Sequence, residues 1–205
     1  MNITVCIPSI PERKYYLQRA LRSVTEQKYQ PSAISVVIDK YKIGAVETRN
    51  ATIRNVSTEW IAFLDDDDEF LPQHLDRLAD CAEDTNADYV YSYFTIQDHI
   101  GNEIPDTILG NFKKPFDPKN PVQTTMTILV KTEFVHKAGK FREPPAGATI
   151  NGQRFGEDYQ FTLDCLAKGA KIVHLPEKTW IWRHHSQNTS GIGEIAREKY
   201  ERNIH

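Results

Sequence analysis

The sequence has 205 residues, 40% of them hydrophobic, and 11 prolines, which predicts one ordinary globular domain with a substantial core. Its 25 Lys and Arg against 28 Asp and Glu give a net charge of -3, so overall charge does not support nucleic-acid binding. No apolar run approaches the roughly 20 residues of a membrane span. Three scattered cysteines and a first strand that begins almost at Met1, leaving no room for a signal peptide, predict a cytoplasmic protein with buried or idle thiols.

The first half of the chain alternates between strand and helix patterns. In chain order the sequence predicts a strand at 3–7 closed by Pro8, a helix with Leu17, Ala20, Leu21 and Val24 on one face, a strand at 34–38, a helix through 46–53, a strand at 60–64, a helix with Leu71, Leu75, Leu78 and Ala82 at helical spacing, and a strand at 89–95. Short connections between such elements predict a parallel, doubly wound, Rossmann-like sheet.

The second half is less regular. A Pro- and Gly-containing segment at 100–123 predicts a long loop or hairpin. After it the sequence predicts a strand at 126–130, a short helix at 133–138 capped by Gly139, a helix beginning at 156–161, a strand at 171–174, the aromatic segment 180–185, and a charged tail of helical composition.

Four consecutive aspartates, Asp65–Asp68, follow the apolar run that starts at Trp60. Pro72 then suits the first turn of a helix. A buried strand does not tolerate unpaired carboxylates, so these acids should lie past its carboxyl end, where open α/β sheets bind ligands. Like charges this close repel one another, and a divalent metal or wide solvent exposure would relieve the repulsion. A metal-binding loop and a solvated acidic loop are therefore the two interpretations.

Taken together and in order, the motifs of the chain resemble those of the family 2 glycosyltransferases of the GT-A fold over roughly residues 2–190. They are the Pro8 loop, Asp39 after the second strand, Arg49-Asn50, Phe63-Leu64-Asp65-Asp66-Asp67-Asp68, Ala138-Gly139-Lys140-Phe141, Gly156-Glu157-Asp158 and an aromatic-Arg-His element near the end. The resemblance implies a mostly parallel sheet flanked by helices. It also implies a single domain over 1–205, with a nucleotide-sugar-binding half at 1–98, an irregular acceptor half at 99–190 and a tail at 191–205.

This resemblance implies an inverting enzyme that moves a sugar from a UDP-sugar to an acceptor hydroxyl by direct displacement. Asp67 would ligate Mn²⁺ or Mg²⁺, hard ions that suit oxygen ligands, and Asp65 or Asp66 would lie towards the ribose and diphosphate. His184 or His185 would complete the metal shell, with His185 favoured. Asp158, in preference to Glu157, would deprotonate the acceptor, although an acid at a helix start also has a structural explanation.

The remaining donor contacts are implied in the same way. Pro8, Ser9 and Arg13 occupy the loop that touches the nucleotide in the family, although Arg13 would also fit a surface charge. Asp39 would contact uracil or cap a turn. Arg49 suits phosphate recognition, while Asn50 would hold loop backbone in place.

For three further residues the favoured interpretation is a structural role. Asp68 fits an acid at a helix start. Trp180 and Trp182 alternate along a strand and would share one face, either as a sugar-stacking wall or, the favoured interpretation, as core.

The acceptor stays open among a glycan, a lipid-linked hydroxyl and a small molecule, and so does the oligomeric state. A phage-type enzyme acting on hydroxymethylated pyrimidines of DNA is an alternative, for which Lys113, Lys114 and Lys119 could meet a phosphate backbone. A non-catalytic nucleotide-sugar-binding protein is a second alternative. A nucleotidyltransferase is disfavoured because the first loop lacks glycines, the first glycine being Gly44.

Overall fold

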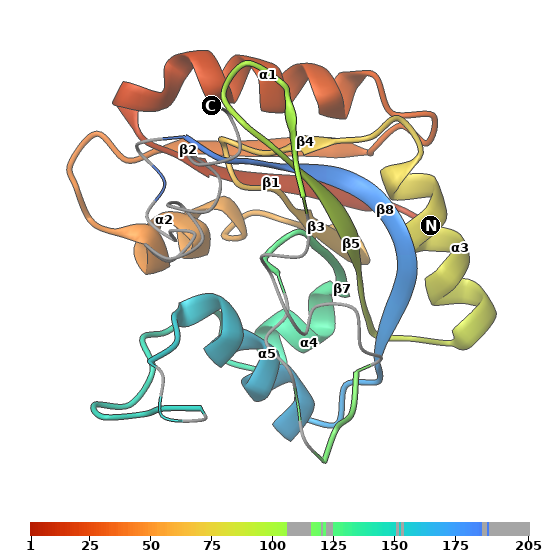
Figure 1. Ribbon diagram of the computed structural model, residues 1–205. Helices are drawn as coiled ribbons and strands as arrows, with labels where there is room; N and C mark the ends of the chain where they lie inside the picture. The colour runs from red at the N-terminus through yellow and green to blue at the C-terminus, as the bar shows by residue number, and fades with distance from the viewer. Residues whose placement is uncertain are drawn as a thin grey trace.

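The computed structural model describes residues 1–105, 116–119, 121, 125–150, 152, 154–185 and 188. Its strands form one sheet with helices on both faces (Figure 1). Lys113, Lys114 and the predicted tail at 191–205 lie outside the described residues. Among the helices that are described, none combines the length and the apolar character needed to cross a membrane.

The first half has the alternation that the sequence predicts. Strand β1 (Ile3–Ser9) lies between β2 (Ala33–Ile38) and β3 (Trp60–Phe63) and runs parallel to both. The carboxyl ends of these three strands therefore meet at one edge of the sheet. The connections contain the 3-10 helix η1 (Pro11–Arg13) and the helices α1 (Lys14–Thr25) and α2 (Ala45–Thr52).

The second half departs from a purely parallel sheet. The strand order is β2-β1-β3-β7-β5-β8-β4, and β7 (Ile128–Lys131) runs antiparallel to its neighbours β3 and β5 (Tyr89–Gln97). An apolar run does not encode strand direction, which is why the sequence missed this reversal. The other described elements are α3 (His74–Thr85), β6 (Glu103–Ile104), α4 (Thr132–Lys137) and α5 (Glu157–Ala167).

Two local predictions are wrong around the acidic run. Residues expected to begin a helix form strand β4 (Glu69–Phe70), antiparallel to β8 (Ile172–Arg183), and α3 begins only at His74, beyond Pro72. β8 also joins two segments that were predicted separately. Its pairing with β5 shifts register around Pro176, which cannot donate a ladder hydrogen bond and interrupts the strand pattern in the sequence.

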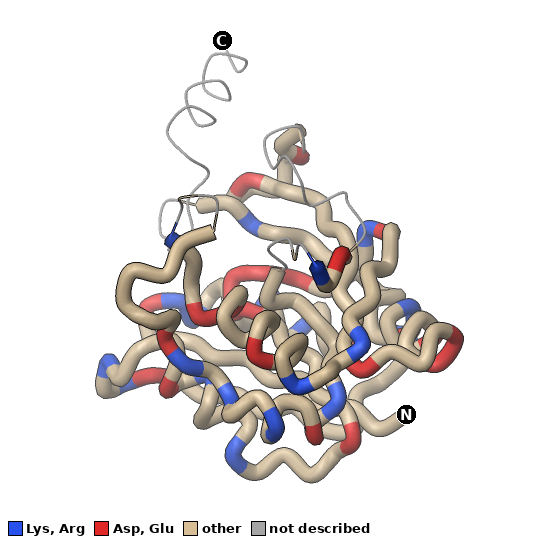
Figure 2. Tube along the Cα trace, turned by 90° about the horizontal axis from the view of Figure 1, so that it is seen from below, with Lys and Arg blue, Asp and Glu red and all other residues tan. Residues whose placement is uncertain are grey.

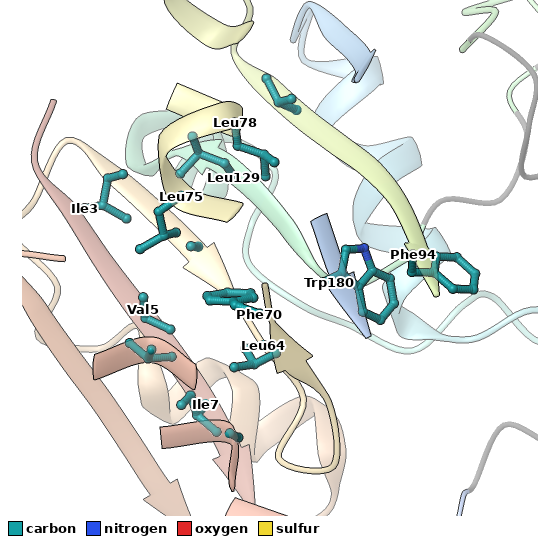
Figure 3. Close-up of a cluster of buried hydrophobic side chains, with 14 of the residues drawn as sticks. Ile3, Val5, Ile7, Leu64, Phe70, Leu75, Leu78, Phe94, Leu129 and Trp180 are labelled. Atoms are coloured by element: carbon teal, nitrogen blue, oxygen red, sulfur yellow. The ribbon is translucent and has the colours of Figure 1, made fainter. Parts of the chain in front are cut away.

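Buried side chains form two clusters, one on each face of the sheet. In β1, Ile3, Val5 and Ile7 point to one cluster and Cys6 to the other, as strand alternation requires. The first cluster lies under α1 and α3 (Figure 3) and includes Leu17, Ala20, Val24, Leu75, Leu78 and Ala82. The second lies on the side of α2, α4 and α5 (Figure 1) and includes Ile53, Phe63, Phe134, Phe161 and Cys165.

The three cysteines are free thiols. Cys6 and Cys165 are buried, and burial raises the pKa of each to about 12. Neither is therefore a thiolate near neutral pH. The prediction of buried thiols is therefore confirmed for these two, while Cys81 is half-buried.

His74, the first residue of α3, should make the fold sensitive to acid. Its buried ring stacks on Phe70, and its Nδ1 lies 2.7 Å from Thr179 Oγ1. Burial lowers the pKa of His74 to about 3. The unfolded chain takes up this proton near pH 6.5, whereas the folded chain takes it up only near its own lower pKa. The free energy of unfolding should therefore fall as pH falls through this window.

The slope of unfolding free energy against pH reports how many more protons the unfolded chain binds than the folded chain. We expect His74→Gln to reduce this difference by up to one proton between about pH 4.5 and 6.5. Urea unfolding at a series of pH values measures that slope, with exposed His99→Gln as the matched control. The prediction fails if His74→Gln and the wild type have the same slope.

Candidate active site

The carboxyl ends of β1, β2 and β3 open onto a cavity of about 280 Å³. Parallel pairing places Ser9, Asp39 and the acidic run at this one edge. The second half of the chain contributes side chains from the start of α5 and from the end of β8. The lining residues are Pro8, Ser9, Ile10, Arg13, Asp39, Gly44, Ala45, Thr48, Arg49, Asp65, Asp66, Asp67, Asp68, Glu157, Trp182 and Asn188.

Asp66 is held by the loop that follows β1. Ser9 Oγ donates a hydrogen bond to Asp66 Oδ2 at 2.7 Å, and Arg13 Nη1 donates to Asp66 Oδ1 at 3.0 Å. Burial raises the pKa of Asp66, and the Ser9 hydroxyl opposes the rise. Of the three loop residues predicted to contact the nucleotide, Ser9 and Arg13 therefore contact the acidic run directly, and the side chain of Arg13 is only 14% exposed.

Asp67 meets the end of β8. Its Oδ2 lies 3.1 Å from His185 Nε2 and 2.9 Å from Arg13 Nη1. The ring of His185 stacks on Tyr16, with centroids 4.3 Å apart, and its backbone N–H donates to the side chain of Asn188. The sequence left open which of the two histidines would join Asp67, and in the structure it is His185 that contacts this residue.

His184 points elsewhere. Its backbone N–H donates to Gln97 O at 2.7 Å, and its ring makes an edge contact with Trp182. The two tryptophans of β8 also differ. Trp180 is buried against Phe94, with centroids 4.6 Å apart, which is the favoured core role, whereas Trp182 is half-buried and lines the cavity.

Arg49 joins the two halves of the site. Its Nη2 donates to Asp65 Oδ1 at 2.8 Å, and its Nη1 pairs with the carboxylate of Glu157, 108 positions further along the chain. The guanidinium also lies 5.9 Å from the ring of Phe141. The guanidinium that the sequence assigned to phosphate recognition is therefore already paired with two carboxylates.

The neighbouring Asn50 is a structural residue, as predicted. Its side-chain amide donates to Phe141 O and accepts from Phe141 N–H, both at 2.9 Å. This pair fixes the segment after Gly139 against α2. It also sets the position of the Phe141 ring beside Arg49.

Asp158 and Glu157 begin α5 after Gly156. Glu157 lines the cavity, whereas Asp158 Oδ1 accepts the backbone N–H of Tyr159 at 2.7 Å. Burial raises the pKa of Asp158, and the Tyr159 N–H and the charge of Arg49 oppose the rise. A Cβ at Gly156 would lie 3.0 Å from Asp158 Oδ1, so glycine leaves room for this carboxylate.

Asp39 organises the loop after β2. Its carboxylate accepts the backbone N–H groups of Ile43 at 2.9 Å, Gly44 at 3.0 Å and Tyr41 at 3.2 Å, and these bonds lower its pKa. Asp39 therefore caps a turn, as one of its two interpretations held, while it also lines the cavity.

Asp68 is not an acid at a helix start. It is buried, and its Oδ1 accepts the backbone N–H of Arg183 at 3.0 Å. The guanidinium of Arg183 donates to Asp98 O and pairs with Glu69. The pairing of β4 with β8 brings these residues together, and no local sequence signal predicts it.

Sequence reasoning missed Tyr16 and Asn188, which support His185. Asn188 follows the aromatic-Arg-His element by three positions, a spacing that suits a side chain capping its own turn. Tyr16 lies on α1, and nothing in its surrounding sequence marks it.

The residues Asp67 and His185 fit a divalent metal as a two-ligand set. Two ligand atoms bound at about 2.1 Å and at a right angle lie about 3 Å apart, close to the 3.1 Å between Asp67 Oδ2 and His185 Nε2. Among the described residues no group of three or more His, Cys, Asp or Glu side chains is arranged to hold a metal. Such a pair suits an ion that takes its other ligands from phosphates and water.

Residues 40–135 match the sequence model of the family described as Glycosyl transferase family 2. The matched segment is somewhat less than half of the chain. It contains Arg49 and the acidic run, whereas Arg13, Asp158 and His185 lie outside it. An uncharacterized glycosyltransferase of Haemophilus influenzae is 34% identical over 71 residues, which cover 34% of this chain and 24% of that protein.

Solved structures of S. aureus TarS share the fold. The fragment 1–349 superimposes with a TM-score of 0.64 at 16% identity, covering 89% of this chain and 60% of that one. Its complex with UDP-GlcNAc gives a TM-score of 0.66 at 15% identity, covering 95% and 61%. The fold is therefore the GT-A fold of these glycosyltransferases, in a chain that spans about 60% of the TarS fragment.

Proposed function

We propose that this protein is a metal-dependent, inverting glycosyltransferase that moves a sugar from a UDP-sugar to an acceptor hydroxyl. The observation that carries the proposal is the convergence of Asp67 and His185 beside the cavity at the ends of β1, β2 and β3. The family 2 segment supports the reaction class, and the TarS complex with UDP-GlcNAc supports a UDP-sugar donor.

The donor would lie along the edge of the sheet. Asp39 and its loop would face the uracil, with Pro8 and Ser9 lining the nucleotide side. Asp65 and Asp66 would lie towards the ribose and diphosphate, and Arg13 would contact a phosphate oxygen. A guanidinium suits this role because its donors match the geometry of phosphate oxygens.

Mn²⁺ or Mg²⁺, held by Asp67 and His185, would act as a Lewis acid on the diphosphate leaving group. Tyr16 stacks on the His185 ring, and Asn188 accepts the backbone N–H of His185, so both help to hold this residue beside Asp67. Trp182 lines the cavity and would offer an apolar surface to the donor.

Asp158 would accept the proton of the acceptor hydroxyl. Its burial makes it a stronger base than an exposed aspartate, because desolvation disfavours the charged form. Glu157 is the poorer candidate because its carboxylate is paired with Arg49. Direct displacement by the deprotonated hydroxyl inverts the anomeric carbon.

The acceptor would be a glycan, a lipid-linked hydroxyl or a small molecule. Lys and Arg are interspersed with Asp and Glu over the described chain (Figure 2) and are not gathered on one side. That distribution does not favour DNA, and of the three lysines considered for it only Lys119 is described. The cytoplasm remains the compartment that the cysteine usage predicts.

The test is UDP release from a panel of UDP-sugars with Mn²⁺, with EDTA, and in the Asp67→Asn variant. We expect donor-dependent release that chelation abolishes and that Asp67→Asn lowers by at least about 100-fold. Hydroxymethylated duplex DNA, added in parallel, tests the DNA acceptor by stimulation of release. Nucleotide binding without release from any donor would favour a non-catalytic binding protein, and no UDP binding at all would reject the donor.

A further inference from the structure

We propose that Arg13 is a built-in cation that competes with a divalent metal for Asp67, and that the donor diphosphate relieves this competition. The inference rests on the proposed function and adds regulation of the same site. It predicts that the free protein binds the metal weakly and that nucleotide and metal bind cooperatively.

The geometry at Asp67 carries the proposal. Arg13 Nη1 lies 2.9 Å from Asp67 Oδ2, the same oxygen that lies 3.1 Å from His185 Nε2. That oxygen is therefore the metal-facing atom of the Asp67–His185 pair and also the partner of a guanidinium. The side chains of Arg13 and Asp67 are only 14% and 9% exposed, so solvent screens their interaction poorly.

Asp66 keeps Arg13 in this place. The same Nη1 donates to Asp66 Oδ1 at 3.0 Å, while Ser9 Oγ fixes the other oxygen of Asp66 at 2.7 Å. The loop after β1 thus delivers one positive charge between two adjacent carboxylates. This arrangement offsets part of the negative charge of the acidic run without any metal.

A metal on Asp67 Oδ2 would stand beside that guanidinium, and two cations at one oxygen repel each other. An incoming diphosphate changes the balance because its oxygens give Arg13 a second anionic partner. Arg13 can then turn from Asp67 to phosphate while the metal takes the carboxylate oxygen. Since coupling between two ligands is reciprocal, UDP should tighten metal binding by the factor by which metal tightens UDP binding.

Arg49 cannot play this part, since Asp65 and Glu157 hold it. Arg13 is the arginine of the cavity that contacts the metal-facing oxygen. The prediction is therefore specific to one side chain.

The experiment measures the dissociation constant of Mn²⁺ by titration calorimetry, without and with saturating UDP. Wild type, Arg13→Gln, Arg13→Lys and the control Arg22→Gln are compared; Arg22 is exposed on α1 and its replacement makes the same change in net charge. We expect UDP to tighten Mn²⁺ binding by about tenfold or more in wild type and in the control. In Arg13→Gln, Mn²⁺ alone should bind at least about threefold tighter than in wild type, and the effect of UDP should shrink.

Arg13→Lys keeps a positive charge and should stay close to wild type, which separates charge from loss of packing. Thermal melts confirm that each variant is folded. If Arg13→Gln binds Mn²⁺ alone no tighter than wild type, the competition is rejected, even if UDP-sugar turnover is intact. If wild type binds no UDP, the proposed function is rejected, while the comparison with Mn²⁺ alone still decides the role of Arg13.

Discussion

Replacing Asp158 by Asn is expected to lower kcat by about 10²–10⁴-fold and to leave UDP affinity within about twofold. The amide cannot accept the proton of the acceptor hydroxyl. It does preserve the shape of the side chain, and its carbonyl oxygen can still accept the Tyr159 N–H. Steady-state UDP release and UDP titration measure the two quantities separately.

The raised pKa of Asp158 predicts how the reaction rate of the wild type depends on pH. Burial raises the pKa of Asp158, and only the ionised form is a base. The rate should therefore fall as pH falls through this raised pKa, at a higher pH than an ordinary aspartate would give. The residual activity of Asp158→Asn should not show this fall in rate at low pH.

The matched control is Asp164→Asn. Asp164 lies on the same helix, but its side chain pairs with Arg142 and accepts a hydrogen bond from Gln160, and none of these three residues lines the cavity. We expect kcat to stay within about twofold of wild type, because the change does not touch the lining of the cavity. Equal losses in the two variants would assign the effect to α5 and remove Asp158 from catalysis.

Replacing Arg49 by Met is expected to destabilise the protein by about 2–3 kcal/mol and to lower the melting temperature by roughly 5–10 °C. The change leaves Asp65 and Glu157 without the cation that joins them. Removing one partner of a buried ion pair costs about 3–5 kcal/mol, and the partial exposure of both carboxylates reduces that figure. Exposed Arg54→Met is the control and should change stability by less than about 0.5 kcal/mol.

Measurements of kcat and UDP affinity distinguish two roles for Arg49, holding the start of α5 and binding phosphate. If it holds the start of α5 in place, Arg49→Lys should lower kcat and leave the UDP dissociation constant within about threefold of wild type. Arg49→Met combined with Glu157→Gln should lose less stability than the sum of the two single changes, since they remove one interaction. A UDP affinity that falls about tenfold or more in Arg49→Lys would instead restore the phosphate-binding role.

Much of the fold was predictable from local pattern. The apolar strands at 3–7, 34–38 and 60–64, separated by amphipathic helices, predicted the parallel half of the sheet. The same pattern placed Asp39 and Asp65 at strand ends, since carboxylates follow directly on apolar runs. These predictions succeeded because strand and helix periods are properties of consecutive residues.

The antiparallel β7, strand β4 and the continuity of β8 were not predictable in this way. Strand direction and the pairing of a two-residue strand depend on which segments meet in space. β4 pairs with β8 more than 100 positions away, and this pairing turned Asp68 from an expected helix-start acid into the partner of Arg183. Pro176 interrupts the pattern of β8 without ending the strand.

The candidate site likewise has features that local sequence predicts and features that depend on long-range contacts. Residue types and their order alone determined which side chains we propose for the chemistry: the acidic run, Asp158 and one of two adjacent histidines. Only the tertiary structure decided that His185 meets Asp67, that Arg49 is shared by Asp65 and Glu157, and that Arg13 contacts the same Asp67 oxygen as His185. The physical reason is that these contacts join residues 16 to 118 positions apart, and their geometry is set by the packing of β1, β3, β8 and α5 around one sheet edge.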